Sequence, residues 1–375
     1  MNNKVKLLVA AIAVGTAATL AGCGGCLGCS GCGNKTETNT LTRSNWFTGT
    51  SYNGIQPSFI EGYNNFSPEI ITYDVTYDDT NANNGYLSVE YNDGKFTTEF
   101  YAVKNWASRI ETIPEGYQPS NPDEVVYYYR TELTISVKYT MKVGDKASSG
   151  PFNDRVVTES YFRAAGKALQ PIYSKQVIKS TSPASYQPSK LEDAYEEIDV
   201  TYENFYNESL TTILSKTYEN GNTESKEFNK LNKLEHTLFD NSSVYVAARA
   251  MKLSGELSET INLFSAAAGG IDEYAIVGSD AALTAQERAD FAKVLSEKGL
   301  SESSESISST AVTISYAGGN LHGTSQTVWY ASLPEKDNAV NVSRATMLKL
   351  SIPISFSLGT LNYSLKEVNS TLWNG

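Results

Sequence analysis

The sequence has little of what most catalytic sites use. It has only two histidines, His236 and His322, and all four cysteines lie before residue 33. It contains no G-x-S-x-G, S-x-x-K or H-E-x-x-H motif and no glycine-rich phosphate loop ending in Gly-Lys-Ser or Gly-Lys-Thr. Catalysis by cysteine or by a serine–histidine pair is therefore not expected in the body of the chain. The sequence favours a protein that is not an enzyme.

Positive charge is also scarce. Lysine and arginine number 30 against 42 aspartate and glutamate residues, which gives a net charge of −12. Because this balance repels a phosphate backbone, we do not expect nucleic acid as a partner. By contrast, 40% of the residues are hydrophobic and 19% are charged, and the chain has 24 tyrosines. Such a composition is typical of a folded protein rather than a disordered one.

The N-terminus has the pattern of a secretory signal. Lys4 and Lys6 precede an apolar run over 7–20, which ends in Leu20-Ala21-Gly22-Cys23. The run is shorter than the roughly 20 residues of a membrane-spanning helix, so it is interpreted as a signal peptide. Residues 20–23 resemble the lipobox of bacterial lipoproteins. The resemblance implies that residues 1–22 are removed, that Cys23 is lipidated, and that the protein is anchored outside the cytoplasm to the cell membrane or the outer membrane.

A cysteine- and glycine-rich segment follows. Cys23, Cys26, Cys29 and Cys32 recur at every third position, but the spacing departs from the C-x2-C-x2-C-x3-C-P run of bacterial ferredoxins. Lipidation of Cys23 would also remove one of the four thiols. We interpret residues 23–45 as a tether and expect the extracytoplasmic β-rich domain to span 46–375, as one domain or two sub-domains.

Alternating apolar and polar residues predict long β-strands. The clearest case runs from Val125 to Val143, a length at which a strand has to bend or divide. A second runs from Met347 to Leu358, where Pro353 predicts an edge or a bulge, and a change of phase at Gly359 predicts another bulge. Further strands are predicted at 71–77, 87–91, 95–103, 156–163, 173–179, 198–202, 210–218, 311–316 and 324–332. Hairpin turns are predicted at 92–94 and 219–221.

The sequence predicts few helices. Thr284 and Glu287 form a capping box that predicts a helix over 284–298. Apolar residues at helical spacing predict a second helix over 227–239. A third is predicted over 242–251, where a strand fits the sequence equally well.

These elements predict a mainly β protein of the α+β type: a curved antiparallel meander sheet or incomplete barrel, with a few amphipathic helices covering one face. Architecture and lipobox together resemble the half-barrel lipid-carrier lipoproteins of bacterial envelopes, at the level of the fold and without a diagnostic motif. The resemblance implies a non-catalytic binding protein for a lipid-like or hydrophobic ligand. The alternative is a cell-surface module that binds glycans or envelope proteins through exposed tyrosine and tryptophan side chains.

Tyrosines of the long alternating segment are the candidate ligand-binding residues. Tyr127, Tyr129 and Tyr139 share its apolar face, and Tyr128 lies on the other face. Because tyrosine has an apolar ring and a polar tip, these side chains suit the wall of a cavity for an amphiphile. Packing beneath helices is the alternative role.

Two acidic segments are candidate metal sites. Asp79, Asn81, Asn83 and Glu90 match positions one, three, five and twelve of a calcium-binding loop, but the glycine of position six is replaced by Asn84. A short connection between strands explains the same residues. Apart from calcium at this loop, the sequence predicts no cofactor.

The second acidic segment comprises Glu192, Asp193, Glu196, Glu197 and Asp199. On a helix these residues would form like-charge pairs four residues apart, which a bound cation would relieve. A solvated acidic surface is the alternative.

Overall fold

The computed structural model describes residues 69–369 except 122, 123, 125, 145, 166, 167, 210, 230, 232, 233, 235–237, 251–257, 268, 300, 302–304, 318–324 and 333–344. The signal peptide, Cys23, the tether over 23–45 and both histidines lie outside the described residues.

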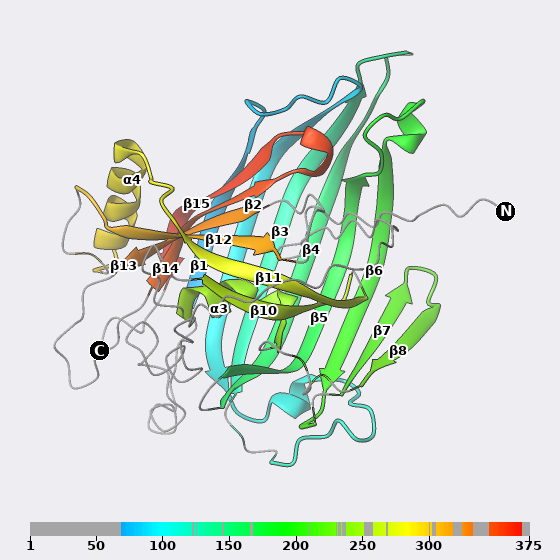
Figure 1. Ribbon diagram of the computed structural model, residues 1–375, viewed down its shortest axis with the longest axis vertical. Coiled ribbons are helices and arrows are strands. Elements are labelled where there is room, and N and C mark those ends of the chain that lie inside the picture. The colour runs from blue at the N-terminus through cyan, green and yellow to red at the C-terminus, as the bar shows by residue number, and fades with distance from the viewer. Residues whose placement is uncertain are drawn as a thin grey trace, which may run out of the picture.

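The described residues form one 15-stranded sheet (Figure 1). Its first half is an antiparallel meander of β1 (Glu69–Asp78), β2 (Leu87–Val103), β3 (Val126–Met141), β4 (Ser148–Ala165), β5 (Ala168–Pro183), β6 (Tyr195–Tyr206), β7 (Thr212–Tyr218) and β8 (Thr223–Phe228). Its second half comprises β9 (Leu238–Asp240), β10 (Ser258–Ser265), β11 (Gly270–Ser279), β12 (Ser309–Tyr316), β13 (Gln326–Ser332), β14 (Ala345–Pro353) and β15 (Thr360–Asn369). The halves join where β1 pairs with β15.

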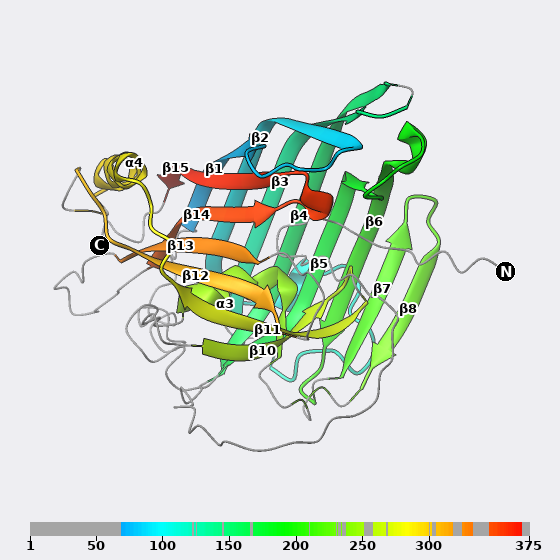
Figure 2. The ribbon, with the colours of Figure 1, turned by 45° about the horizontal axis from the view of Figure 1, so that its top comes forward.

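The sheet is strongly curved, so that its two halves face each other across the core (Figure 2). Apolar side chains of both halves belong to one cluster, among them Phe96 and Leu133 from the first half and Val312 and Leu348 from the second. Strand β9 contacts β5, yet the two terminal strands, β8 and β9, are not paired with each other. The prediction of a mainly β protein with a curved, open sheet is confirmed.

Two α-helices occur in the described part of the chain. The first, α3 (Val244–Ala250), follows the short helix η5 (Asn241–Ser243), and together they contact β4, β10 and β14. The hydroxyl of Tyr330 in β13 donates to the carbonyl of Tyr245, 2.9 Å away. The second, α4 (Ala285–Ser296), lies beside β15 at the side of the molecule (Figure 1). The expectation that helices together cover one face of the sheet is therefore not confirmed.

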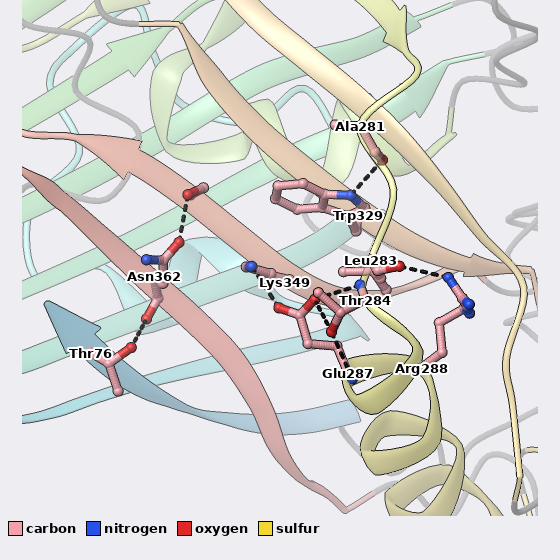
Figure 3. A network of polar contacts seen from close by, with 10 residues as sticks. Thr76, Ala281, Leu283, Thr284, Glu287, Arg288, Trp329, Lys349 and Asn362 are labelled. Atoms are coloured by element: carbon pink, nitrogen blue, oxygen red, sulfur yellow. Dashed lines mark hydrogen bonds and ion pairs between the residues drawn. The ribbon is translucent and has the colours of Figure 1, made fainter. Parts of the chain in front are cut away.

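Helix α4 is held by polar contacts at its N-terminus (Figure 3). The predicted capping box is present: the Glu287 backbone N–H donates to the Thr284 hydroxyl, and the Glu287 carboxylate accepts from the Thr284 backbone N–H at 2.8 Å. The other carboxylate oxygen of Glu287 lies 2.7 Å from the ammonium of Lys349 in β14. The indole N–H of Trp329 in β13 donates to the carbonyl of Ala281. The prediction of this helix is confirmed.

Two of the sequence predictions are wrong. The helix predicted over 227–239 is not formed at either described end of that range, because Phe228 ends β8 and Leu238 begins β9, each paired in the sheet. A hairpin at 92–94 is not formed either, because β2 continues through it. The register shifts between Asn92 and Lys95, with Asp93 at a φ of 53°, so the turn residues form a bulge instead.

The phase change at Gly359 is a chain reversal rather than the predicted bulge. Strand β14 ends at Pro353, which pairs with Thr360 at the start of β15. The backbone N–H of Ile354 donates to the carbonyl of Gly359, whose φ of 106° favours glycine. Pro353 lies at a strand end, where a missing N–H is tolerated. The long alternating segment, by contrast, forms one 16-residue strand, β3.

Candidate functional site

A pocket of about 670 Å³ opens on strands β4 to β7. Strand alternation places its floor on the face of the sheet that carries the core: Asp154 is two residues from the core residue Val156, and Ser180 is two residues from Ile178, which pairs with Val156. The volume is in the range of small-molecule sites, about 300–1,000 Å³. The pocket is therefore large enough for a ligand of drug or lipid size.

The pocket has a mixed lining. Its buried side chains include the apolar Val200 and the amphipathic Tyr202. They also include three polar residues: Asp154, Ser180 and Thr181. Half-buried Phe152 and Ile198 add apolar surface. Its exposed lining residues are mostly polar or charged: Pro151, Asn153, Lys179, Glu196, Glu197, Glu219 and Asn220. A lining that combines apolar and polar side chains suits an amphiphile better than a purely polar solute.

Asp154 is the buried carboxylate of this pocket, with a relative exposure of 3%. The pairing of β4 with β5 ends at Arg155 and Lys179, so the backbone N–H of Thr181 donates to the Asp154 carboxylate instead, 3.0 Å from each oxygen. The Thr181 hydroxyl donates to Oδ1 at 3.1 Å. Burial raises the pKa of Asp154 to about 7, although the hydrogen bonds from Thr181 act in the opposite direction.

Further hydroxyls lie buried around this carboxylate. The Tyr139 hydroxyl donates to the carbonyl of Thr181 at 3.2 Å, and burial together with Tyr139 and Asp154 raises the pKa of Tyr91 well above its usual range. A side-chain hydrogen bond links the hydroxyls of Tyr91 and Tyr139, whereas those of Ser180 and Ser182 are buried without a hydrogen bond to any described residue. We call Tyr91, Tyr139, Asp154, Ser180 and Ser182 the buried polar cluster. Of these hydroxyls, that of Ser180 belongs to a residue that lines the pocket, so it is the one placed to meet a ligand, since leaving it unpaired is costly.

A lysine lies at the β7 side of the pocket. The ammonium of Lys216 is 4.4 Å from the ring centroid of Tyr218 and 5.7 Å from that of Tyr202. These cation–π contacts hold its alkyl stem along the pocket wall. This side of the pocket therefore combines aromatic surface with positive charge.

The three predicted ligand-binding tyrosines are all buried on the core face of β3. Tyr127 stacks on Phe100 and Phe162, and Tyr129 makes an edge contact with Phe100. Tyr127, Tyr129 and Tyr139 are absent from the lining of the pocket, although Tyr139 reaches it indirectly through Thr181. The rings of Tyr127 and Tyr129 thus pack against aromatic side chains of the neighbouring strands.

Sequence reasoning missed Asp154, Ser180 and Ser182. The available signal was a polar residue in the phase of an apolar face: Asp154 precedes Val156, and Ser180 and Ser182 follow Ile178. Strand alternation alone would have placed them toward the core.

The acidic segment at 192–199 is divided between a short 3-10 helix and strand β6. Glu192 and Asp193 lie in the short helix η3 (Leu191–Asp193), and Glu196, Glu197 and Asp199 lie in β6. The predicted like-charge helical pairs are therefore absent. The last three residues line the pocket, and the Asp199 carboxylate pairs with the Lys179 ammonium at 3.2 Å.

The candidate calcium loop connects β1 and β2. Asp79, Asn81 and Asn83 lie in the connection and Glu90 lies in β2. The side chain of Asn84 is buried and bonded to backbone groups: its amide donates to two carbonyls, and its Oδ1 accepts from two backbone N–H groups.

The carbonyl of Asn84 also accepts from the ammonium of Lys142 at 2.8 Å, which adds a positive charge beside the loop. In the described part of the chain, no three His, Cys, Asp or Glu side chains are grouped to hold a metal. Calcium binding stays a prediction.

The convex face of strands β2 to β6, opposite the face that carries the core and the pocket, has a row of aromatic rings. Tyr101, Tyr128, Tyr161, Tyr173 and Phe205 are register partners across β2 to β6, with successive centroid separations of 5.0, 5.0, 5.9 and 4.8 Å. The connection between β2 and β3 packs on this row, with Trp106 of the short helix η2 (Trp106–Arg109) fully buried against it. Large hydrophobic side chains that are exposed, among the described residues, are limited to Val143 and Tyr186.

Comparison of the chain with known protein families, with curated proteins and with solved structures gives no match. Among the helices in the described part of the chain, none has the length and apolar character needed to cross a membrane.

Proposed function

We propose that this protein is a lipid-anchored, extracytoplasmic binding protein that holds a lipid-like ligand in the pocket on β4 to β7. The observation that carries the proposal is the pocket of about 670 Å³ on the core face of a curved sheet, with apolar and polar side chains buried in its floor and charged ones at its rim. The apolar part of an amphiphile would cover Ile198 and Val200, and its polar part would reach the polar lining.

The N-terminal motif supplies the second element of the proposal. The lipobox-like residues 20–23 would place two or more acyl chains at Cys23, enough for stable membrane attachment. A tether over 23–45 would then let the folded domain meet ligands at the membrane surface. The membrane is thus the expected partner, and the binding step requires no cofactor or catalytic group.

The alternative, a surface module for glycans or envelope proteins, depends on exposed aromatic side chains. The convex row that would suit this role is covered by the connection containing Trp106. The geometry of the described residues therefore favours binding in the pocket over binding on the face of the sheet.

Uptake of a fluorescent amphiphile by the purified full chain tests the proposal. Ile198 is half-buried in the pocket, so Ile198→Trp is expected to fill it and weaken the affinity by about tenfold or more. Val143→Trp is the matched control, because Val143 is exposed and outside the pocket. Absence of uptake by the wild-type protein, or equal uptake by both variants, would contradict the proposal.

A further inference from the structure

We propose that the pocket is selective for amines: the polar end of its ligand is an ammonium group, and Asp154 is the counter-ion that selects it. This inference rests on the proposed function, since it concerns the ligand of the same pocket. It makes Asp154 the specificity-determining residue and places the headgroup site at Asp154 and Ser180, the two members of the buried polar cluster that line the pocket.

The first argument is the geometry of the carboxylate. Asp154 lines the pocket and is almost fully buried, yet its three hydrogen-bond contacts all come from one residue, Thr181. Because a carboxylate accepts about four hydrogen bonds, Oδ2 retains capacity for a donor from a ligand. Ser180 also lines the pocket, and its buried hydroxyl has no hydrogen bond to a described residue. Asp154 and Ser180 thus offer two acceptors to one donor group.

The second argument is the absence of a compensating cation. Within the described residues Asp154 forms no ion pair, and the causes of its raised pKa include no charged neighbour. Of the lysines that line the pocket, Lys179 pairs with Asp199, and Lys216 lies on the rings of Tyr202 and Tyr218 at the β7 side. A ligand ammonium would supply the missing charge, whereas a ligand carboxylate would meet a second buried anion.

Several other titratable groups lie on the strands around Asp154. The neighbouring strands contribute Tyr91 from β2, Tyr139 from β3, Lys179 from β5, and Tyr195, Glu196, Glu197 and Asp199 from β6. Burial raises the pKa of Tyr91 and of Tyr139, so both hydroxyls stay neutral near pH 7. Asp154, with a pKa of about 7, changes charge between about pH 6 and about pH 8.

Matched ligands with one alkyl chain test the inference. Decylamine, decanol and decanoate are titrated against the purified full chain, by displacement of the fluorescent amphiphile used above. Because the Asp154 carboxylate attracts an ammonium group and repels a carboxylate, decylamine is expected to bind about tenfold to a hundredfold more tightly than decanoate at pH 8. Decanol, which keeps the chain and lacks the charge, is expected to lie between them.

The variant Asp154→Asn tests whether the Asp154 carboxylate is responsible for the preference for decylamine over decanoate. The variant keeps an acceptor for the Thr181 N–H but loses the charge, so the preference for decylamine over decanoate is expected to vanish while decanol affinity changes less than about twofold. Asp193→Asn is the matched control, because Asp193 is exposed, belongs to the same acidic segment and does not line the pocket. It is expected to retain the preference.

The pH dependence provides a readout that needs no variant. As Asp154 ionises, the affinity for decylamine is expected to rise about tenfold from pH 6 to pH 8, while that for decanol stays constant. Equal binding of all three ligands, tighter binding of decanoate, or a preference that survives Asp154→Asn would overturn the amine inference and leave the proposed function intact. Failure of the wild-type protein to bind any of the ligands or the fluorescent amphiphile would overturn both.

Discussion

Replacing Asp154 with asparagine is expected to make the protein more stable at alkaline pH and to change its stability less at acidic pH. The carboxyl group is buried, and its pKa rises from 3.8 to about 7 because burial disfavours the charged form. Between these two values the folded state binds the proton more tightly than the unfolded state does. The free energy of unfolding therefore falls as the pH rises toward 7, and above 7 the folded protein holds a buried negative charge.

The size of the effect follows from the two pKa values. The difference between the folded and unfolded states corresponds to about 4 kcal/mol of unfolding free energy at high pH. About 3 kcal/mol of this is expected to develop between about pH 5 and about pH 8. Asparagine resembles the protonated carboxyl and still accepts from Thr181, so the variant lacks this penalty.

Urea unfolding of the wild-type protein and of Asp154→Asn, followed at several pH values, measures the difference. Taking the difference at each pH cancels the titration of all other groups, including both histidines. The stability advantage of the variant is expected to grow with pH, and the exposed control Asp193→Asn is expected to follow the wild-type curve. A constant difference between pH 5 and pH 8, or an advantage that shrinks with rising pH, would refute the reasoning.

Three further predictions concern the fold and the anchor. Thr284→Ala removes the helix cap of α4 and is expected to lower the unfolding free energy by about 1 kcal/mol in urea unfolding, whereas Thr284→Ser is expected to retain most of it. Gly359→Ala is expected to cost more than about 1 kcal/mol, because φ is 106° and the new Cβ would lie 2.6 Å from a backbone oxygen of β1; Gly85→Ala, with open space around it, is the control. A thermal midpoint for Gly359→Ala equal to that of the wild type would contradict this. Cys23→Ala is expected to abolish incorporation of labelled palmitate in cells, and retained label would disprove lipidation at this residue.

Local patterns predicted the parts of the fold that depend on neighbouring residues. The alternation of β3 placed Tyr127 and Tyr139 on the core face and Tyr128 on the convex face, since successive strand residues point to opposite sides. The cap of α4 was equally readable, because Thr284 and Glu287 are three residues apart.

Pairing between distant segments explains what local patterns missed. Leu238 has helical spacing to its neighbours in sequence, but pairing of β9 with β10 makes it a strand residue. The turn signal at 92–94 does not reverse the chain, because β3 pairs with β2 on both sides of it. In each case a sheet partner far along the chain determined the outcome.

The pocket has the same origin. Asp154, Ser180 and Ile198 are brought together by the pairing of β4, β5 and β6, although 44 positions of the sequence separate the first from the last. The burial of Asp154, which gives the carboxyl its unusual pKa, depends on this assembly and on no short motif. Tyr127, Tyr129 and Tyr139 were predicted as ligand-binding residues because they share the apolar face of one alternating segment, but their rings are buried in the core.

Native mass spectrometry of the full chain, purified from the membrane fraction of the cells that produce it, tests the central claim most directly. The account predicts a population with an added mass, released by organic extraction as an amphiphile and lost in Ile198→Trp but retained in Val143→Trp. A protein that carries no such ligand, and that takes up none when incubated with a lipid extract, would contradict the claim that the pocket on β4 to β7 is a ligand-binding site.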